Sequence, residues 1–266
     1  MTYVISDLHG YPLEKLKALL KKAGFGFWAE ASEAEMQSAE AEASETEEQS
    51  AQAESAEAGS ADDLYVLGDV IDRNGDGGID VLRWIMEQPN VHMILGNHEC
   101  MLLACRFLFE EVTDESLDAL TWEQLDSYEI WKLNGCAPTV ASLRKLTREQ
   151  QADLLDFLGD LPLYEAATVG GRDYLFVHAG LGNFHPDKKM SEYTMDELVW
   201  TRPEPNTVYF DDIMTILGHT PTMLYGAMYK GRIFKRRTWM DIDAGAAGGL
   251  PPILLRLDDM EEFQLS

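Results

Sequence analysis

The chain has 266 residues, of which 45% are hydrophobic, so it is long enough for one domain with a substantial buried core. It contains no run of about 18 apolar residues that could span a membrane, and its first residues lack the basic and apolar regions of a signal peptide. The net charge of −26 argues against binding nucleic acid or an anionic membrane through the bulk surface.

The acidity is concentrated in one segment. Residues 29–61 carry ten Glu and no Lys or Arg, and the rest of the chain keeps a net charge of −16. A phosphorylated substrate would therefore need positive charge placed locally, by arginines or metal ions. The three cysteines show no C-x-x-C spacing, so we expect no disulfide framework and a cytoplasmic location.

The chain begins with a predicted strand, a turn and a helix. Residues 3–6 form a short apolar run that predicts the strand. Pro12 suits the first turn of the helix, and Gly24 suits its C-terminal cap. Between these two residues the apolar side chains recur at helical spacing, at Leu13, Leu16, Leu19 and Leu20.

The composition then changes at residues 29–61. This segment is almost entirely Ala, Glu, Ser and Gln, and it has no aromatic or branched aliphatic residue. Such a composition cannot bury a core. We interpret the segment as a low-complexity acidic insertion in a single domain that spans residues 1–266, and as a surface linker rather than a binding element.

Beyond the insertion, strands and helices alternate. Residues 99–160 are mostly helical in pattern, and Thr147 with Gln150 has the spacing of a capping box. The remaining segments predict strands at 64–67, 91–95, 174–177 and 213–217, a helix at 78–87, and closing strands within 231–246 and 251–257. The order predicts an α/β protein with a helical excursion at about 100–165.

Five of the predicted strands end in polar side chains. In open α/β sheets, ligands bind at the carboxyl ends of strands. Four of the six histidines of the chain lie in these endings. The endings read "SDLHG" (Asp7, His9), "GDVIDR" (Asp69, Asp72, Arg73), "GNHE" (Asn97, His98, Glu99), "VHAG" (His178) and "GHTP" (His219).

Each ending alone has an ordinary structural explanation. Asp7 could form a turn, Asp72 and Arg73 could be a local ion pair, and Asn97 could cap a helix. A single histidine such as His178 is more often structural than a ligand. The joint presence of all five endings at successive strands makes these separate explanations improbable.

Together the endings offer ligands for two divalent ions. Carboxylate, imidazole and amide oxygen suit first-row metals, with Mn²⁺ as our first choice and Fe or Zn²⁺ as alternatives. Because no cysteine belongs to the set, we do not expect a structural zinc site. Two neighbouring ions need one shared anionic ligand. Asp69 lies centrally in the order of the endings and is the expected bridge.

As a set, these motifs resemble the calcineurin-like metallophosphoesterases. They are most similar to the phosphoprotein phosphatase branch, which includes bacterial and phage serine/threonine phosphatases and is related to the symmetrical diadenosine tetraphosphatases. "WTRP" (residues 200–203) and "WKLNGCAPT" (residues 131–139) extend the resemblance. It covers residues 3–28 and 62–256, nearly everything except the insertion.

The resemblance implies a four-layer α/β/β/α sandwich and a role for each motif residue. Arg73 and Arg202 would bind the phosphate, and His98, oriented by Asp72, would donate a proton to the leaving group. The implied ligands of the first metal are Asp7, His9 and Asp69, and those of the second are Asp69, Asn97, His178 and His219.

The chain departs from the family pattern at three places. Asn74 stands where Gly usually follows "DR", and Cys136 stands where a second Gly is usual. The third departure is the insertion at 29–61. None of them removes an implied ligand. The first two could reshape the substrate groove, so they bear on specificity rather than on chemistry.

These observations predict a metal-dependent phosphatase that acts by direct attack of a metal-bridging hydroxide. A serine/threonine protein phosphatase is our first expectation. A symmetrical bis(5'-nucleosyl)-tetraphosphatase or a broad phosphomonoesterase is the alternative within the family, so the partner is a phosphorylated protein or a small phosphorylated compound. A metal-binding scaffold without activity is the alternative outside enzymes. The oligomeric state is left open.

Overall fold

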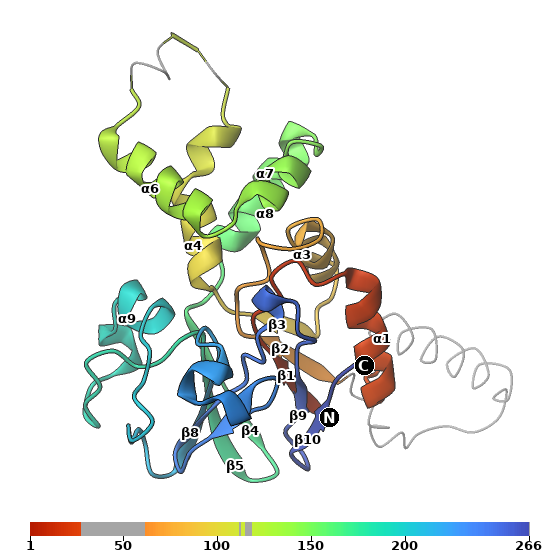
Figure 1. The fold of residues 1–266 in the computed structure, drawn as a ribbon, viewed down its shortest axis with the longest axis vertical. Helices are drawn as coiled ribbons and strands as arrows, with labels where there is room; N and C mark the ends of the chain where they lie inside the picture. The colour runs from red at the N-terminus through yellow and green to blue at the C-terminus, as the bar shows by residue number, and fades with distance from the viewer. Residues whose placement is uncertain (28–61, 112, 115–118, 266) are drawn as a thin grey trace, which may run out of the picture.

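The computed structural model describes residues 1–27, 62–111, 113–114 and 119–265. The predicted acidic insertion at 29–61 lies outside the described residues, so its role and the single-domain organisation stay predictions. The described chain forms two five-stranded mixed sheets with helices on their outer sides (Figure 1).

The first sheet contains the strands that begin and end the chain. Its order is β10-β9-β1-β2-β3, in which β1, β2 and β3 are parallel and β9 and β10 are antiparallel to their neighbours. The bounds are β1 Thr2–Ile5, β2 Asp63–Val66, β3 Val91–Met93, β9 Leu254–Arg256 and β10 Glu261–Phe263.

The second sheet is built from the middle of the chain. Its order is β4-β5-β6-β8-β7, in which β5, β6 and β8 are parallel. The bounds are β4 Tyr164–Val169, β5 Arg172–Val177, β6 Ile213–Leu217, β7 Phe234–Lys235 and β8 Trp239–Asp241.

Alternation along the strands produces the layers. Successive side chains of a strand point to opposite faces of its sheet. In β1, Val4 faces the core between the two sheets, and Ile5 faces the helices. In β5, Phe176 faces the same central core, whereas Val177 packs on the outer face of the second sheet. The two sheets therefore pack face to face, as the four-layer prediction requires.

The helices complete the outer layers. Side chains from α1, α3, α4, α7 and α8 pack with the first sheet in one core, and α9 packs on the second sheet. Figure 1 shows α6, α7 and α8 extending beyond one end of the sheets, so the expected helical excursion is present. The bounds are α1 Leu13–Ala23, α3 Ile79–Met86, α4 Asn97–Ala104, α6 Trp122–Leu133, α7 Ala137–Leu143, α8 Arg148–Gly159 and α9 Met195–Val199, with short 3₁₀ turns η1 Arg106–Phe109, η2 Met190–Glu192, η3 Thr222–Tyr225, η4 Ala227–Tyr229 and η5 Ala246–Gly248.

Local signals in the sequence fix the helix ends. Gly24 closes α1 in the left-handed conformation, with φ of 82°. Thr147 begins α8 by accepting a hydrogen bond from the backbone N–H of Gln150, as the capping-box spacing predicts. Thr194 begins α9 in the same way, through Glu197. These three helix boundaries were therefore readable from single residues.

Strand β4 was not predicted. It pairs with β5 in an antiparallel hairpin whose two-residue loop is Gly170–Gly171, and both glycines have positive φ, at 58° and 77°. Two adjacent glycines between strands are a hairpin signal, because this tight turn needs positive φ at both central positions. β4 escaped notice because it contains Ala166 and Ala167 and buries none of its residues fully.

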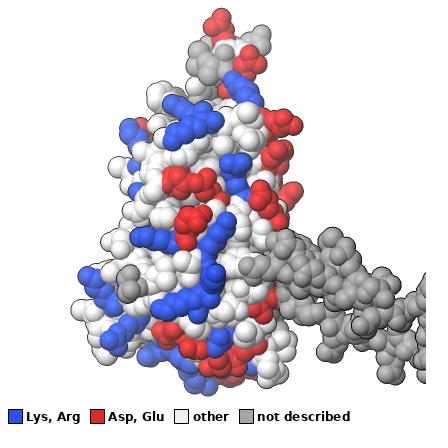
Figure 2. Space-filling model, turned by 90° about the vertical axis from the view of Figure 1, so that its right-hand side faces the viewer, with Lys and Arg blue, Asp and Glu red and all other residues white. Residues whose placement is uncertain are grey.

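Charges of both signs stand side by side on one face of the molecule. Figure 2 shows this face, where Lys and Arg stand among Asp and Glu although the whole chain has a net charge of −26. In the described part of the chain, no helix has the length and apolar character needed to cross a membrane.

Candidate active site

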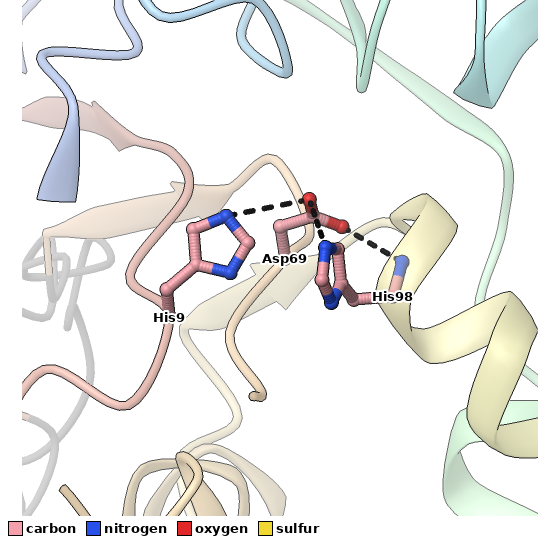
Figure 3. A group of neighbouring side chains, drawn as sticks. All are labelled: His9, Asp69 and His98. Atoms are coloured by element: carbon pink, nitrogen blue, oxygen red, sulfur yellow. Dashed lines mark hydrogen bonds and ion pairs between the residues drawn. The ribbon is translucent and has the colours of Figure 1, made fainter. Parts of the chain in front are cut away.

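Residues from both sheets converge where the parallel strands end. One side-chain ligand atom from each of His9, Asp69 and His98, of the kinds that can hold a metal ion, lies within 4.8 Å of the other two (Figure 3). Such atoms of Asp69, His178 and His219 form a second group of the same size. All five residues are buried. Asp69 belongs to both groups, which is the placement that a bridging ligand needs.

The carboxylate of Asp69 faces three imidazoles. Its Oδ2 lies 3.6 Å from Nε2 of His9 and 3.9 Å from Nε2 of His98. Its Oδ1 lies 3.4 Å from Nε2 of His178 and accepts a hydrogen bond of 3.0 Å from the backbone N–H of His98. The two oxygens thus point to the two groups separately.

Backbone carbonyls orient two of these imidazoles. Nδ1 of His9 donates to the carbonyl of Ile71 at 3.1 Å, and Nδ1 of His178 donates to the carbonyl of Leu67 at 2.7 Å. When Nδ1 of a neutral ring carries the proton, Nε2 has a free lone pair. Each ring therefore presents its lone pair to Asp69, an arrangement that is typical of metal-ligating histidines.

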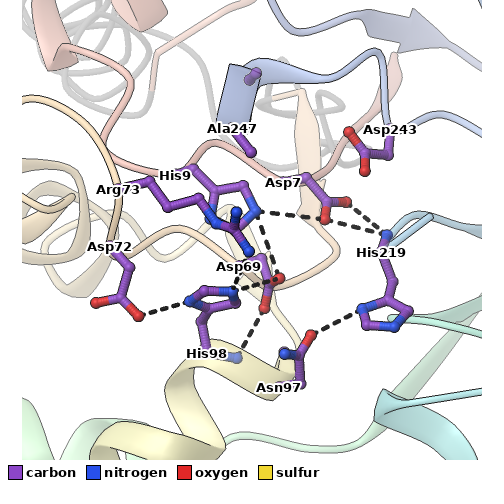
Figure 4. Close-up of polar contacts among 12 residues, drawn as sticks. Asp7, His9, Asp69, Asp72, Arg73, Asn97, His98, His219, Asp243 and Ala247 are labelled. Atoms are coloured by element: carbon purple, nitrogen blue, oxygen red, sulfur yellow. Dashed lines mark hydrogen bonds and ion pairs between the residues drawn. The ribbon is translucent and has the colours of Figure 1, made fainter. Parts of the chain in front are cut away.

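The Asn97 side chain completes the second group. Its Oδ1 lies 3.0 Å from Nε2 of His178 and 2.8 Å from Nδ1 of His219 (Figure 4). Because Nδ1 of His178 carries the ring proton and donates it to the carbonyl of Leu67, Nε2 of His178 is an acceptor. The 3.0 Å contact therefore brings two acceptors together, Nε2 of His178 and Oδ1 of Asn97. Two acceptors at this distance repel each other unless a cation lies beside them. The donor set therefore fits a metal ion.

Asp7 braces the two sheets against each other. Its carboxylate accepts the backbone N–H of His219 at 2.9 Å and also the hydroxyl of Ser6. Its Oδ1 lies 3.9 Å from Nε2 of His9, so it borders the first group. All six residues that the sequence predicts as metal ligands thus lie in one buried cluster, and Figure 4 labels five of them, all except His178.

Burial changes the proton affinity of these ligands. It is the main cause that raises the pKa values of Asp7 and Asp69 well above their usual range, and neighbouring carboxylates add to it. Burial also lowers the pKa of His178 to about 3 and that of His219 to about 2. The imidazoles are therefore neutral, as metal ligands must be, and divalent cations would offset the buried carboxylates.

A hydrogen-bonded chain holds His98 in the first group. Its Nδ1 lies 2.6 Å from Oδ2 of Asp72. Asp72 accepts further hydrogen bonds from Nε1 of Trp131 at 2.7 Å and from the hydroxyl of Thr139 at 2.6 Å. Both partners belong to the "WKLNGCAPT" segment, for which the sequence analysis had found no role. The expected contact between Asp72 and His98 is present.

The two expected arginines border the same pocket. Nη2 of Arg73 lies 3.2 Å from Nε2 of His98, and the backbone N–H of Arg73 donates to the carbonyl of Gly135. Arg202 comes from the loop after α9. The pocket has a volume of about 210 Å³ and is lined by His9, Asp69, Arg73, Asn97, His98, Asn134, Trp200, Arg202, Pro221, His219, Leu224, Asp243 and Ala247.

Glu99 has a role that the sequence analysis missed. Its buried carboxylate accepts the backbone N–H groups of Asp69 at 2.8 Å, Val70 at 2.9 Å, Ile71 at 3.2 Å and Gly96 at 3.1 Å. It therefore clamps the loop after β2 to the start of α4. A charged residue that directly follows two site residues in "GNHE" was the available signal.

Asp243 is a second residue that was missed. Its carboxylate lies in the pocket near Asp7 and His219 (Figure 4), and its Oδ1 accepts the backbone N–H of Gly245 at 2.8 Å. Burial raises the pKa of Asp243 to about 6, whereas the guanidinium groups of Arg73 and Arg202 oppose this rise. The sequence placed Asp243 in a closing strand, so its position at a strand end was not recognised.

The backbone of the site is strained. Six site residues other than glycine have positive φ: Asp7 51°, His9 43°, Asp69 52°, Asp72 75°, Arg73 66° and His219 67°. Such conformations cost free energy and persist where the surrounding contacts impose them. Their concentration at the strand ends identifies these loops as the functional region of the fold.

Comparison with known proteins agrees with this geometry. The family model of calcineurin-like phosphoesterases matches residues 2–236. The chain belongs to the calcineurin-like phosphoesterase family. The family and the enzyme class expected from the sequence, a phosphoester hydrolase, are both in line with this match.

Relatives within the phosphoesterase family differ in what their names state. A symmetrical bis(5'-nucleosyl)-tetraphosphatase from Chromobacterium violaceum is 31% identical over 122 residues, which are 45% of this chain and 33% of the relative. The alignment thus spans only a third of the relative's length. Among solved structures, a candidate diadenosine tetraphosphatase matches with a TM-score of 0.58 and 14% identity, over 99% of this chain and 92% of that one.

A protein serine/threonine phosphatase from Saccharomyces cerevisiae has the same fold. It matches with a TM-score of 0.52 and 15% identity, over 100% of this chain and 80% of that one. At this level of identity, the two structural matches establish the shared phosphoesterase fold and nothing about substrate.

Proposed function

We propose that this phosphoesterase hydrolyses phosphate esters with the help of two divalent metal ions, and that phosphoserine and phosphothreonine in proteins are its preferred substrates. The observation that carries the proposal is the shared position of Asp69 between two groups of buried imidazoles. Beside it lie a histidine held by a carboxylate and two arginines.

The proposed ligands divide at Asp69. Asp7 and His9 would complete the first position, and Asn97, His178 and His219 the second. Two ions bound there would supply a water-derived nucleophile at neutral pH and charge stabilisation for the phosphoryl group. We propose Mn²⁺ as the ion, with Fe or Zn²⁺ as the alternatives, since all three suit oxygen and imidazole ligands.

Arg73 and Arg202 would hold the phosphoryl oxygens. Both side chains are exposed at the pocket, and a guanidinium offers paired donors that match the geometry of phosphate. The two guanidinium groups would supply the local positive charge that an anionic substrate needs in this acidic chain.

His98 would protonate the leaving oxygen. Asp72 fixes the ring by accepting the Nδ1 proton, so Nε2 faces the pocket. Burial first, and then the nearby Arg73 guanidinium, lower the pKa of His98 to about 3, so the ring is neutral in the absence of substrate. A phosphate held by Arg73 would offset that guanidinium charge and favour the proton on Nε2.

The pocket fits one phosphoryl group better than a chain of four. Arg73 and Arg202 are the only Lys or Arg side chains among the described residues that line it. A tetraphosphate would need more positive charge than these provide. Trp200 and Leu224 also line the pocket and are 40% and 63% exposed. Exposed apolar side chains suit the residues that flank a phosphorylated serine or threonine.

Symmetrical hydrolysis of dinucleoside tetraphosphates is the second candidate. The observation in its favour is the similarity over 122 residues to the tetraphosphatase from Chromobacterium violaceum. The same site chemistry would serve both reactions, because each breaks a bond between phosphorus and a bridging oxygen.

A substrate panel tests the proposal. The full chain, loaded with Mn²⁺, would be assayed with a phosphothreonine peptide, diadenosine tetraphosphate and p-nitrophenyl phosphate. We expect the highest kcat/KM with the peptide. A preference for the tetraphosphate would select the second candidate, and similar values for all three would indicate a broad phosphomonoesterase. Bound metal without turnover of any substrate would indicate a scaffold.

A cytoplasmic location remains a proposal. The three cysteines, Cys100, Cys105 and Cys136, are all free. Free thiols suit a reducing compartment. Burial raises the pKa of Cys100 to about 12, so this cysteine, two residues after His98, is unsuited to act as a nucleophile.

A further inference from the structure

Asn74, which the resemblance marks as a departure from the family pattern, ties two loops together. Its Nδ2 lies 3.1 Å from the carbonyl of His9, 3.2 Å from that of Ala246 and 3.5 Å from that of Ala247. One side-chain amide thus joins the loop after β1, which carries a proposed metal ligand, to the 3₁₀ turn η5 from the end of the chain.

The turn η5 has little else to hold it. Residues 245–249 are three glycines and two alanines, and Gly245 and Gly249 adopt positive φ at 98° and 85°. Glycine-rich backbone loses much conformational entropy when it is ordered. Among the described residues, Asn74 is the only side chain from outside residues 241–251 that is hydrogen-bonded to this segment.

The tied segment separates two pockets. On one side lies the catalytic pocket, which Arg73 and Ala247 line. On the other side lies a larger pocket of about 450 Å³, which Asn74 and Ala246 line. Among its lining residues the only charged one is Lys15, and the others include Leu8, Tyr11, Pro12, Leu250 and Pro251. Its size and apolar lining are those of small-molecule sites.

We propose that Asn74 is a positioning residue that holds η5 as a wall between the catalytic pocket and this apolar pocket, and so limits the size of the substrate group next to the phosphate. This inference rests on the proposed phosphoester hydrolysis. With the wall held, a bulky aromatic group beside the phosphate is excluded from the apolar pocket. With the wall released, the two pockets join and such a group gains apolar contact.

Two variants test the hydrogen bonds that the Asn74 amide makes to the two loops. Asn74→Gly removes the side chain, and Asn74→Asp keeps its shape but replaces the donating amide by an acceptor that faces three carbonyls. Asn183→Gly is the matched control, because Asn183 also donates its amide, to Glu197 at 2.7 Å, in an exposed loop away from the pocket. Amide hydrogen exchange of residues 245–250 should be about fivefold faster in both Asn74 variants and unchanged in the control.

The kinetic measurement compares naphthyl phosphate with p-nitrophenyl phosphate. Both Asn74 variants should raise the ratio of kcat/KM for the larger over the smaller substrate about fivefold, and the change should fall on KM rather than on kcat. A merely structural role would instead lower kcat for both substrates alike and reduce bound metal. That outcome, or an unchanged ratio, would overturn the inference.

The two proposals fail in different ways. If the wild-type protein turns over neither ester with metal bound, the proposed function is wrong. The hydrogen-exchange measurement still decides on the tie, because it needs no activity. If the wild-type protein is active and exchange at residues 245–250 is the same in all variants, the role of Asn74 is wrong and the proposed function stands.

Discussion

The two sheets supply the site in different ways. The loops after β1 and β2 carry five residues other than glycine with positive φ, from Asp7 to Arg73, and buried side chains brace them. The second sheet contributes His178, with ordinary backbone, and His219, whose φ is 67°. The strained conformations are thus concentrated on the sheet that supplies most of the carboxylates.

The difference shows which part of the site lowers the stability of the fold. Carboxylates gathered in a buried site repel one another, and strained loops resist the conformation that gathers them. Glu99 opposes the strain with hydrogen bonds to the loop after β2. Trp131 and Thr139 donate hydrogen bonds to Asp72 and so stabilise its charged form. The neutral imidazoles of the second sheet need less bracing.

Replacement of the shared ligand should have the largest effect. Asp69→Asn removes the anionic charge from both groups at once, and we expect at least about a thousandfold loss of kcat/KM and loss of bound metal together. Elemental analysis after gel filtration, with turnover of p-nitrophenyl phosphate, checks this. Two ions retained in the variant would show that Asp69 does not bridge. His219→Ala, on the second sheet, should leave the first group intact and retain one ion.

Loss of the proposed proton donor should have the next largest effect. His98→Ala should keep both ions and lower kcat about a hundredfold for esters with poor leaving groups. The loss should be much smaller for p-nitrophenyl phosphate, whose leaving group needs little protonation. The dependence of kcat on leaving-group pKa gives the measurement, with Asp72→Asn expected to follow the same trend. A variant that is equally active on all esters would contradict the assignment of His98.

The clamp of the first sheet can be tested through stability. Glu99→Gln places an amide N–H group against backbone donors, and we expect a loss of about 3 kcal/mol in the free energy of unfolding. Urea denaturation of the wild-type and variant proteins measures it. Glu197→Gln is the matched control, since Glu197 accepts the backbone N–H of Thr194 in an exposed capping box. Equal losses in the two variants would remove the contrast between the sheets.

The smallest effect concerns pH. Hydrogen bonds from the Thr194 backbone first, and then from Lys188 and Asn183, lower the pKa of Glu197 to about 2. A depressed carboxyl pKa gives stability that is present above the unfolded pKa and is lost as pH falls towards the folded value. The difference in Tm between wild type and Glu197→Gln should thus be present at pH 7 and shrink from pH 4.5 downward. A constant difference would contradict this reading.

The sequence predicted which residues gather in the site better than it predicted the side chains that support them. Residues at strand ends, such as His9 and Asn97, were readable because strand, turn and polar residue follow one another along the chain. The contacts of Trp131 and Thr139 with Asp72 join residues about 60 positions apart, and no local pattern reports such a distance. Strand β4 was missed for a different reason, because its two adjacent alanines, Ala166 and Ala167, give no clear alternation of apolar and polar residues.

The shared position of Asp69 would also couple the two proposed ions. Burial raises the pKa of this carboxyl, so an ion that bound there first would compete with a proton for it. An ion that followed would meet a carboxylate already held in its ionised form. We therefore predict that the affinity of the first step depends on pH more steeply than the affinity of the second. Calorimetric titration in buffers of different ionisation enthalpy would resolve the two steps as separate proton counts.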